Sequence, residues 1–254
     1  MNTRVFAYAQ ARLQARHALR PGAADWRLLA GVGDAVHFLQ VARRTRLRPW
    51  VLGLQGEQDS HLIELTLRRQ FQDYAGEVLH WLPPPWNRSS AWFMRLPELP
   101  AIQHLSSGAE PLAWMRGDPR LVVFTRGDRE QRLLSLQHSD CAPLVKDWQR
   151  GESIAGAWFS HWRTLWVDDR AGHEGLEQLT ALVQRSLQGM ATGNGGDFQA
   201  HRERLLKQLS ALFRRYAFQP AACYAHLALT ALDLLTLRGE LLQRVLFPAV
   251  RVVP

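Results

Sequence analysis

Residues 221–247 read AACYAHLALTALDLLTLRGELLQRVLF, and the helical pattern of the chain is strongest here. Apolar side chains fall on almost every side of a helix drawn through this segment, so most of its circumference should be buried. The apolar positions are Leu227, Leu229, Leu232, Leu234, Leu235, Leu237, Leu241, Leu242, Val245 and Leu246. We therefore predict a buried helix at residues 221–247, with Leu234 in the core.

The same region is too interrupted to be read as a membrane span. Its longest stretch without a formal charge, residues 216–232, contains Pro220 and is followed by Asp233. A spanning helix needs about 20 predominantly apolar residues. The apolar run near the start, residues 5–9, is shorter still. We expect no targeting segment and a soluble protein.

Helical periodicity continues through most of the chain. The expected helices cover residues 3–19, 22–41 with a break at 31–33, 59–81, 87–94, 102–105, 129–136, 142–149, 154–166, 175–188 and 198–216. Residues 59–81 give the clearest helix of the first half because they contain no proline. The prolines of residues 83–85 form a rigid connector. The glycines within 193–196 separate two helices, and Asp197 is a natural cap for the second.

One run, Leu-Val-Val-Phe at residues 121–124, resembles a β-strand. A single short strand cannot form a sheet, so the pattern predicts an all-α fold, a helical bundle built from related multi-helix units. Residues 106–128 are expected to be mostly loop. We place the boundary at 117–128, between an N-terminal unit of residues 1–117 and a C-terminal unit of residues 118–254. The two units together can pack as one domain.

The composition is that of a globular protein, with 254 residues of which 46% are hydrophobic and 21% charged. It excludes a disordered tail and a collagenous repeat. Lysine and arginine number 31 against 23 acids. Residues 1–100 carry 13 basic and 8 acidic side chains, and residues 201–254 carry 8 and 3. Cationic ends favour an acidic partner, which can be nucleic acid, anionic lipid headgroups or an acidic protein.

No motif assembles a reactive site. Residues 31–36 begin like a dinucleotide-binding turn but lack its third glycine, and residues 193–196 lack the lysine of a phosphate loop. Residues 151–156 miss the GxSxG spacing by one position. The ten histidines include no pair at metal-binding spacing. We predict a non-catalytic protein with no cofactor and no metal.

Several polar residues are better explained as local structure. Ser153 and the pair Asp168-Asp169 suit helix caps, and His173-Glu174 suits a solvated turn because glycines flank it. Cys141 and Cys223 lie far apart without a CxxC pattern, which fits a reducing cytoplasm. The aromatic residues of 158–166 have helical spacing, which is typical of a core and not of a ligand site.

Two clusters of arginines are candidate partner-binding sites. Arg43, Arg44, Arg46 and Arg48 lie at the end of an expected helix, and Arg214 and Arg215 lie on the helix of residues 198–216. Cations at a helix C-terminus also complement its dipole, so stabilisation of the helix end is an equally good explanation. A basic helical surface would also suit phosphate groups, and a nucleic-acid-binding or protein-interaction module is the alternative hypothesis.

Three segments of the sequence share a pattern with one known family. The first is YAQARLQAR at residues 8–16, followed by Leu19 and residues 28–29. The second is the long helix of residues 62–81. The third runs from FQP at residues 218–220 through Tyr224 and Leu227 to residues 237–246. Together they resemble the central-stalk C-subunit family of A-type and V-type rotary ATPases, known as the d-subunit in the eukaryotic enzyme. Asp233 stands where that family usually has a glutamate.

The resemblance implies a funnel of related helical units and a non-catalytic adaptor role. Such an adaptor links the membrane rotor ring to the central shaft and couples ATP turnover to ion translocation. The implied partners are the rotor proteolipid ring and the central-shaft subunits. The implied location is cytoplasmic, peripheral on the inner face of the membrane and without a transmembrane span. Typical members repeat the helical unit three times, whereas we expect two units here.

Overall fold

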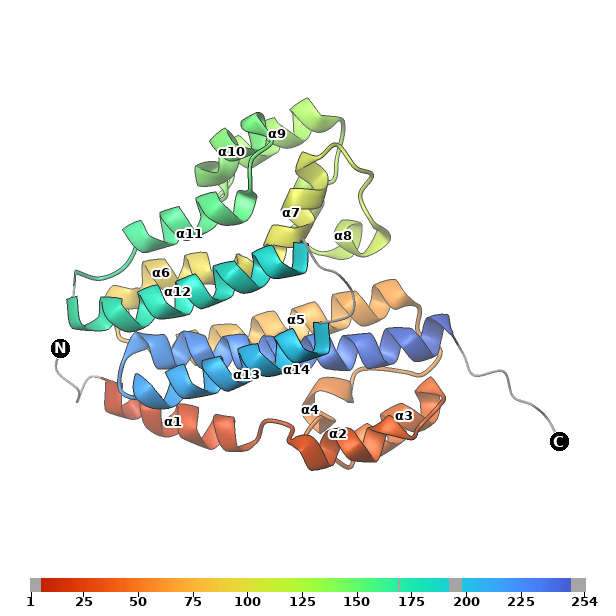
Figure 1. The fold of residues 1–254 in the computed structure, drawn as a ribbon. Helices are drawn as coiled ribbons and strands as arrows, with labels where there is room; N and C mark the ends of the chain where they lie inside the picture. The colour runs from red at the N-terminus through yellow and green to blue at the C-terminus, as the bar shows by residue number, and fades with distance from the viewer. Residues whose placement is uncertain (1–5, 169, 192–197, 248–254) are drawn as a thin grey trace.

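The computed structural model describes residues 6–168, 170–191 and 198–247. These residues form helices and turns and no strand, which confirms the predicted all-α bundle. Figure 1 shows two layers: helices from both ends of the chain form the lower layer, and helices from the middle of the chain form an upper lobe. The helix labelled α12 lies between them.

The helices of the lower layer are α1 (Ala7–Ala18), α2 (Ala23–Ala30), α3 (Ala35–Ala42), α4 (Arg48–Val51), α5 (Ser60–Leu79), α13 (Phe198–Arg215) and α14 (Pro220–Leu246). The remaining α-helices are α6 (Asn87–Phe93), α7 (Leu99–Ser106), α8 (Ala113–Gly117), α9 (Arg129–Gln137), α10 (Val145–Arg150), α11 (Ile154–Thr164) and α12 (Arg170–Ala191). Short 3-10 helices form η2 (Pro84–Trp86), η3 (Leu96–Glu98), η4 (Val122–Phe124) and η5 (Ala142–Leu144).

Helix α14 is the central element of the lower layer. Helices α1, α3, α5, α12 and α13 all pack against it. Leu227, Leu229 and Leu237 are fully buried, and Leu234 is only 6% exposed. The predicted core helix is confirmed, and it is continuous through Asp233.

By length and composition alone, α14 could also cross a membrane, which the sequence had argued against. However, 72% of its most apolar 18-residue window is buried inside the protein. Such burial is typical of the core helix of a globular protein.

Aspartates begin several helices where the sequence changes from polar to apolar. The carboxylate of Asp34 accepts a hydrogen bond from the backbone N–H of His37 at 2.8 Å, and Asp59 accepts one from Leu62 at 2.8 Å. These bonds satisfy N–H groups that have no partner within the helix. Ser153 occupies the predicted cap position of α11, but its side chain makes no capping bond. The caps predicted at Asp169 and Asp197 lie outside the described residues.

The strand-like run at residues 121–124 is a 3-10 turn, so that interpretation was wrong. Local bonds replace a strand ladder: the Phe124 N–H donates to the carbonyl of Leu121 at 2.8 Å. Leu121 and Phe124 face the core while Val123 is 47% exposed. The run therefore forms a single turn whose first and last side chains, Leu121 and Phe124, pack into the core.

His173 and Glu174 lie inside α12, not in a loop. Gly175 was interpreted as a turn residue, but it lies in α12, where it allows close packing. A Cβ atom added to Gly175 would lie 2.8 Å from Cγ of Tyr216 and 2.8 Å from Cβ of Ala221. Gly175 thus allows α12 to approach the turn between α13 and α14.

Aromatic side chains fill the interior of the upper lobe. Trp158 is fully buried, and Trp162 is 1% exposed. The indole N–H of Trp92 donates to the carbonyl of Trp158, and that of Trp162 donates to Ser89, each at 3.1 Å. The predicted aromatic core is confirmed. It forms one cluster with residues from both sides of the expected boundary at 117–118, including Phe6 and Tyr224, and that boundary stays a prediction.

Candidate functional site

The arginine cluster after α3 divides into two kinds of side chain. Arg43 is half-buried, and its Nη2 donates to the carbonyl of Leu54 at 2.8 Å. Arg44, Arg46 and Arg48 are exposed. The guanidinium of Arg46 also reaches the carbonyl of Arg20 at 3.4 Å. Arg43 therefore holds the loop in place, and the other three arginines form a cationic surface.

The second predicted cluster lies at the C-terminal end of α13. Both Arg214 and Arg215 are exposed. Arg215 pairs with Glu174 of α12 at 3.5 Å and lies over the ring of Tyr216. Figure 1 shows this end of α13 on the side of the N-terminus, away from α4. The two clusters are thus separate surfaces, each on a different part of the lower layer.

Three arginines in and just after the first helix were not predicted as functional. Arg12 lies over the ring of Trp81, 5.0 Å from its centroid. Arg16 pairs with Glu77 of α5 at 2.7 Å. Arg20 binds both carboxylate oxygens of Asp233 in α14, at 2.8 and 3.0 Å. Spacing of four residues places these cations on one side of α1, where they attach it to α5 and α14.

Asp233 and Arg20 form a largely buried ion pair, with side chains 8% and 15% exposed. Burial raises the pKa of Asp233 to about 6, and the nearby guanidinium of Arg20 opposes this rise. Both oxygens of the carboxylate accept hydrogen bonds from one planar guanidinium, which fixes their geometry as well as their charge. This pair joins segments 213 positions apart in the sequence.

A buried histidine lies next to this ion pair. Nε2 of His226 is 2.7 Å from the hydroxyl of Tyr74, and His226 itself is fully buried. The ring of His17 lies 5.8 Å from that of His226 and stacks on Phe213. Burial, together with the adjacent charges of His17, Arg20 and Arg16, lowers the pKa of His226 to about 3. His226 is therefore neutral at physiological pH.

The neutral state of His226 predicts acid sensitivity. Below the ordinary histidine pKa of about 6.5 the unfolded chain binds a proton at this residue, whereas the folded chain does not. The free energy of unfolding therefore falls as the pH drops toward 3. A His226→Gln variant should lose this component. We expect the stability lost between pH 7 and pH 5 to be smaller than in the wild type by roughly 2 kcal/mol.

Urea unfolding of both proteins at the two pH values measures this difference. Glutamine keeps a polar group near Tyr74, so the variant tests the proton and not only the contact. Equal losses in the two proteins would show that His226 does not control the acid response.

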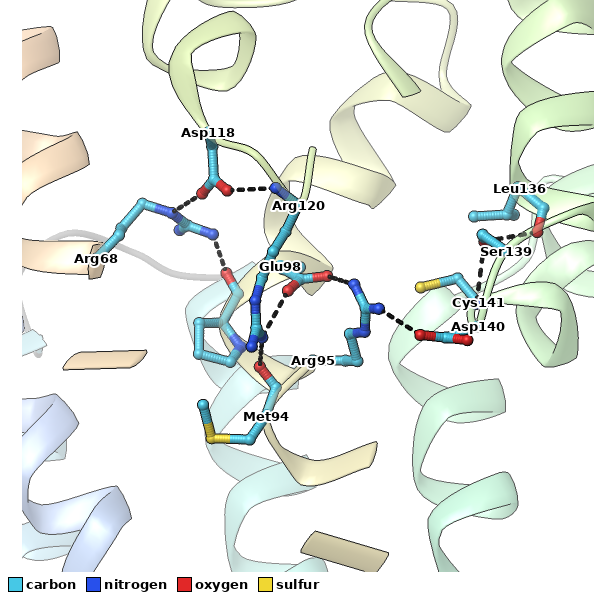
Figure 2. Close-up of polar contacts among 11 residues, drawn as sticks. Arg68, Met94, Arg95, Glu98, Asp118, Arg120, Leu136, Ser139, Asp140 and Cys141 are labelled. Carbon is cyan, nitrogen blue, oxygen red and sulfur yellow. Dashed lines mark hydrogen bonds and ion pairs between the residues drawn. The ribbon is translucent and has the colours of Figure 1, made fainter. Parts of the chain in front are cut away.

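A second polar network connects the layers (Figure 2). Glu98, fully buried, accepts bonds from Arg95 at 3.1 Å and from Arg120 at 3.2 Å. Arg68 of α5 lies 3.5 Å from Asp118 and donates to the carbonyl of Pro97 at 2.8 Å. The network thereby ties α5 to the turn before α7.

The acidic and basic groups of this network are paired with one another. Burial raises the pKa of Glu98, while the charges of Arg95 and Arg120 oppose that change. Burial also raises the pKa of the nearby Cys141 thiol to about 11, so this cysteine is protonated and weakly nucleophilic. Each oxygen of Glu98 accepts a hydrogen bond from a guanidinium, and the side chain is fully buried.

The described part of the chain contains no group of three histidine, cysteine, aspartate or glutamate side chains placed to hold a metal ion. Comparison of the chain with protein-family models, curated proteins and solved structures finds no match. The resemblance to the central-stalk protein of rotary ATPases therefore stays a hypothesis.

Proposed function

We propose that this chain is a non-catalytic adaptor that links the rotor ring of a rotary ATPase to its central shaft. The observation that carries the proposal is the meeting of the three segments that resemble the central-stalk family. They form α1, α5 and α14, which come from distant parts of the sequence and are joined directly by ion pairs.

These ion pairs suit a part that transmits rotation. Arg16 and Glu77 join α1 to α5 at 2.7 Å. Arg238 of α14 pairs with Glu64 of α5. With the pair between Arg20, just after α1, and Asp233, each of the three helices is tied to the other two. A rotor adaptor needs such a stiff frame, since a flexible connection would absorb torque.

The exposed arginines supply the contact surface in this proposal. Acidic loops of a partner or anionic headgroups at a membrane surface would be attracted to them. Arg44 and Arg48 are the best probes, because Arg43 also supports its own loop. The protein would act in the cytoplasm, peripheral to the membrane, as the resemblance implies.

The first experiment is purification of the tagged protein from its native host in mild detergent at low salt. We expect a proteolipid ring and ATPase subunits to copurify, and nuclease treatment to leave that recovery unchanged. Recovery of nucleic acid alone would favour the alternative, a basic nucleic-acid-binding module. Recovery of neither ring nor ATPase subunits would refute the adaptor hypothesis.

Charge reversal tests the surface itself. An Arg44→Glu, Arg48→Glu variant should lose most partner recovery, with the melting temperature unchanged, because both side chains are exposed. An Arg126→Glu, Arg150→Glu variant is the matched control, with the same charge change at exposed positions of the upper lobe. The surface assignment would be wrong if both variants lost recovery equally, or if the melting temperature fell together with recovery.

A further inference from the structure

A groove of about 450 Å³ lies between α2, α12, α13 and α14. Its lining includes the buried side chains of Leu29 and Leu205 and the partly exposed Trp26, Leu232 and Leu235. Small-molecule sites range from roughly 300 to 1,000 Å³ and are mostly apolar with a few polar groups. The groove has the size and the lining of such a site.

One end of this groove is cationic. Arg202 of α13 lines it, and Nη1 of Arg202 donates to the hydroxyl of Thr236. Nε of the same guanidinium is buried and has no hydrogen-bond partner among the described residues. The guanidinium as a whole is only partly buried and lines the groove, so its charge is available to an anionic group of a ligand.

The other charged groups at the groove leave this end positive. Glu240 also lines the groove, but its carboxylate pairs with Arg244 at 2.7 Å. Asp233 lies near Arg202, but its carboxylate is already paired with Arg20. Arg27 is exposed on the rim. His201 is engaged with Ser186 at 3.0 Å.

We propose that this groove binds a single-chain amphiphile with a carboxylate head, such as a medium-chain fatty acid. The apolar walls hold the chain, and the guanidinium of Arg202 pairs with the carboxylate. Charge-assisted hydrogen bonds of this kind are roughly twice as strong as neutral ones, so the head group should determine affinity. The proposal does not depend on the adaptor role, since it rests on the groove alone.

Calorimetric titration of the whole protein with decanoate and with 1-decanol tests the proposal, because the two ligands share a chain and differ in the head. We expect one molecule of decanoate to bind, at least about tenfold more tightly than 1-decanol. An Arg202→Gln variant should bind the two ligands about equally. Equal affinities in the wild type, or no decanoate binding at millimolar concentration, would overturn the proposal.

A second variant tests the walls independently of Arg202. Gly239 lines the groove, and no heavy atom lies within 4 Å of a Cβ added there. Gly239→Leu should therefore fold normally, which a melting curve checks, and weaken both ligands by about tenfold or more by occupying the groove. Unchanged decanoate affinity in this variant would place the binding elsewhere and refute the site.

Discussion

A Leu234→Asp variant is expected to be unfolded or insoluble. Leu234 is 6% exposed and belongs to an apolar cluster with Leu39, Ile63 and Leu237. An aspartate there would bury a charge without a partner, which costs several kcal/mol even after the protein relaxes. Domains are stable by only about 5–15 kcal/mol in total. The loss of leucine contacts adds about 2–5 kcal/mol.

The next position offers a matched control for this substitution. Leu235 follows in the same helix but is 53% exposed. A Leu235→Asp variant makes the same chemical change at a surface site, so we expect a loss of about 1 kcal/mol or less. Thermal unfolding followed by circular dichroism, with the soluble fraction after expression, compares the two. Similar melting temperatures would show that α14 is not oriented as described.

Removing the carboxylate of Glu98 is expected to have the second largest effect. A Glu98→Ala variant leaves Arg120 without a carboxylate partner and leaves Arg95 only the exposed Asp140. Breaking a buried ion pair by deleting one member typically costs about 3–5 kcal/mol. For a chain of this size that loss corresponds to a melting temperature lower by roughly 6–20 °C.

An exposed pair serves as the comparison for Glu98. Glu110 and Arg116 are 3.8 Å apart, with side chains 87% and 59% exposed. Glu110→Ala should cost less than about 1 kcal/mol, because solvent screens such pairs. Glu98→Gln should fall between the two, since it removes the charge and keeps one acceptor oxygen. If the Glu98→Ala and Glu110→Ala variants had the same melting temperature, the buried network would not stabilise the fold.

Local patterns in the sequence were sufficient to predict most helices and the buried character of α14. Periodicity and caps act over a few residues, so residues 59–81 could be read directly, and α5 spans Ser60–Leu79. Gly175 shows the limit of this approach. A glycine in a sequence can indicate either a turn or a close approach between helices. At Gly175 the two are distinguished only by the position of Tyr216 in the fold.

The ion pairs could not be predicted because their partners are distant in the sequence. Arg20 and Asp233 are 213 positions apart, and Arg238 and Glu64 are 174 apart. A charged residue on a helix is normally taken to face solvent. The arginine surface stays a prediction. Arg44 and Arg48 are exposed as a binding surface requires, whereas Arg43 serves its own loop.

The central position of α14 also bears on how the chain matures on the ribosome. Helices α1, α3, α5, α12 and α13 are all synthesised before the helix against which they pack. Until α14 emerges, the apolar surface that each of them packs against it stays uncovered, although α12 and α13 already contact each other and α5 contacts α8. Exposed apolar surface in such intermediates promotes aggregation. The lower layer can therefore be completed only at the end of translation. A product terminated before Pro220 would lack the helix that completes both apolar clusters.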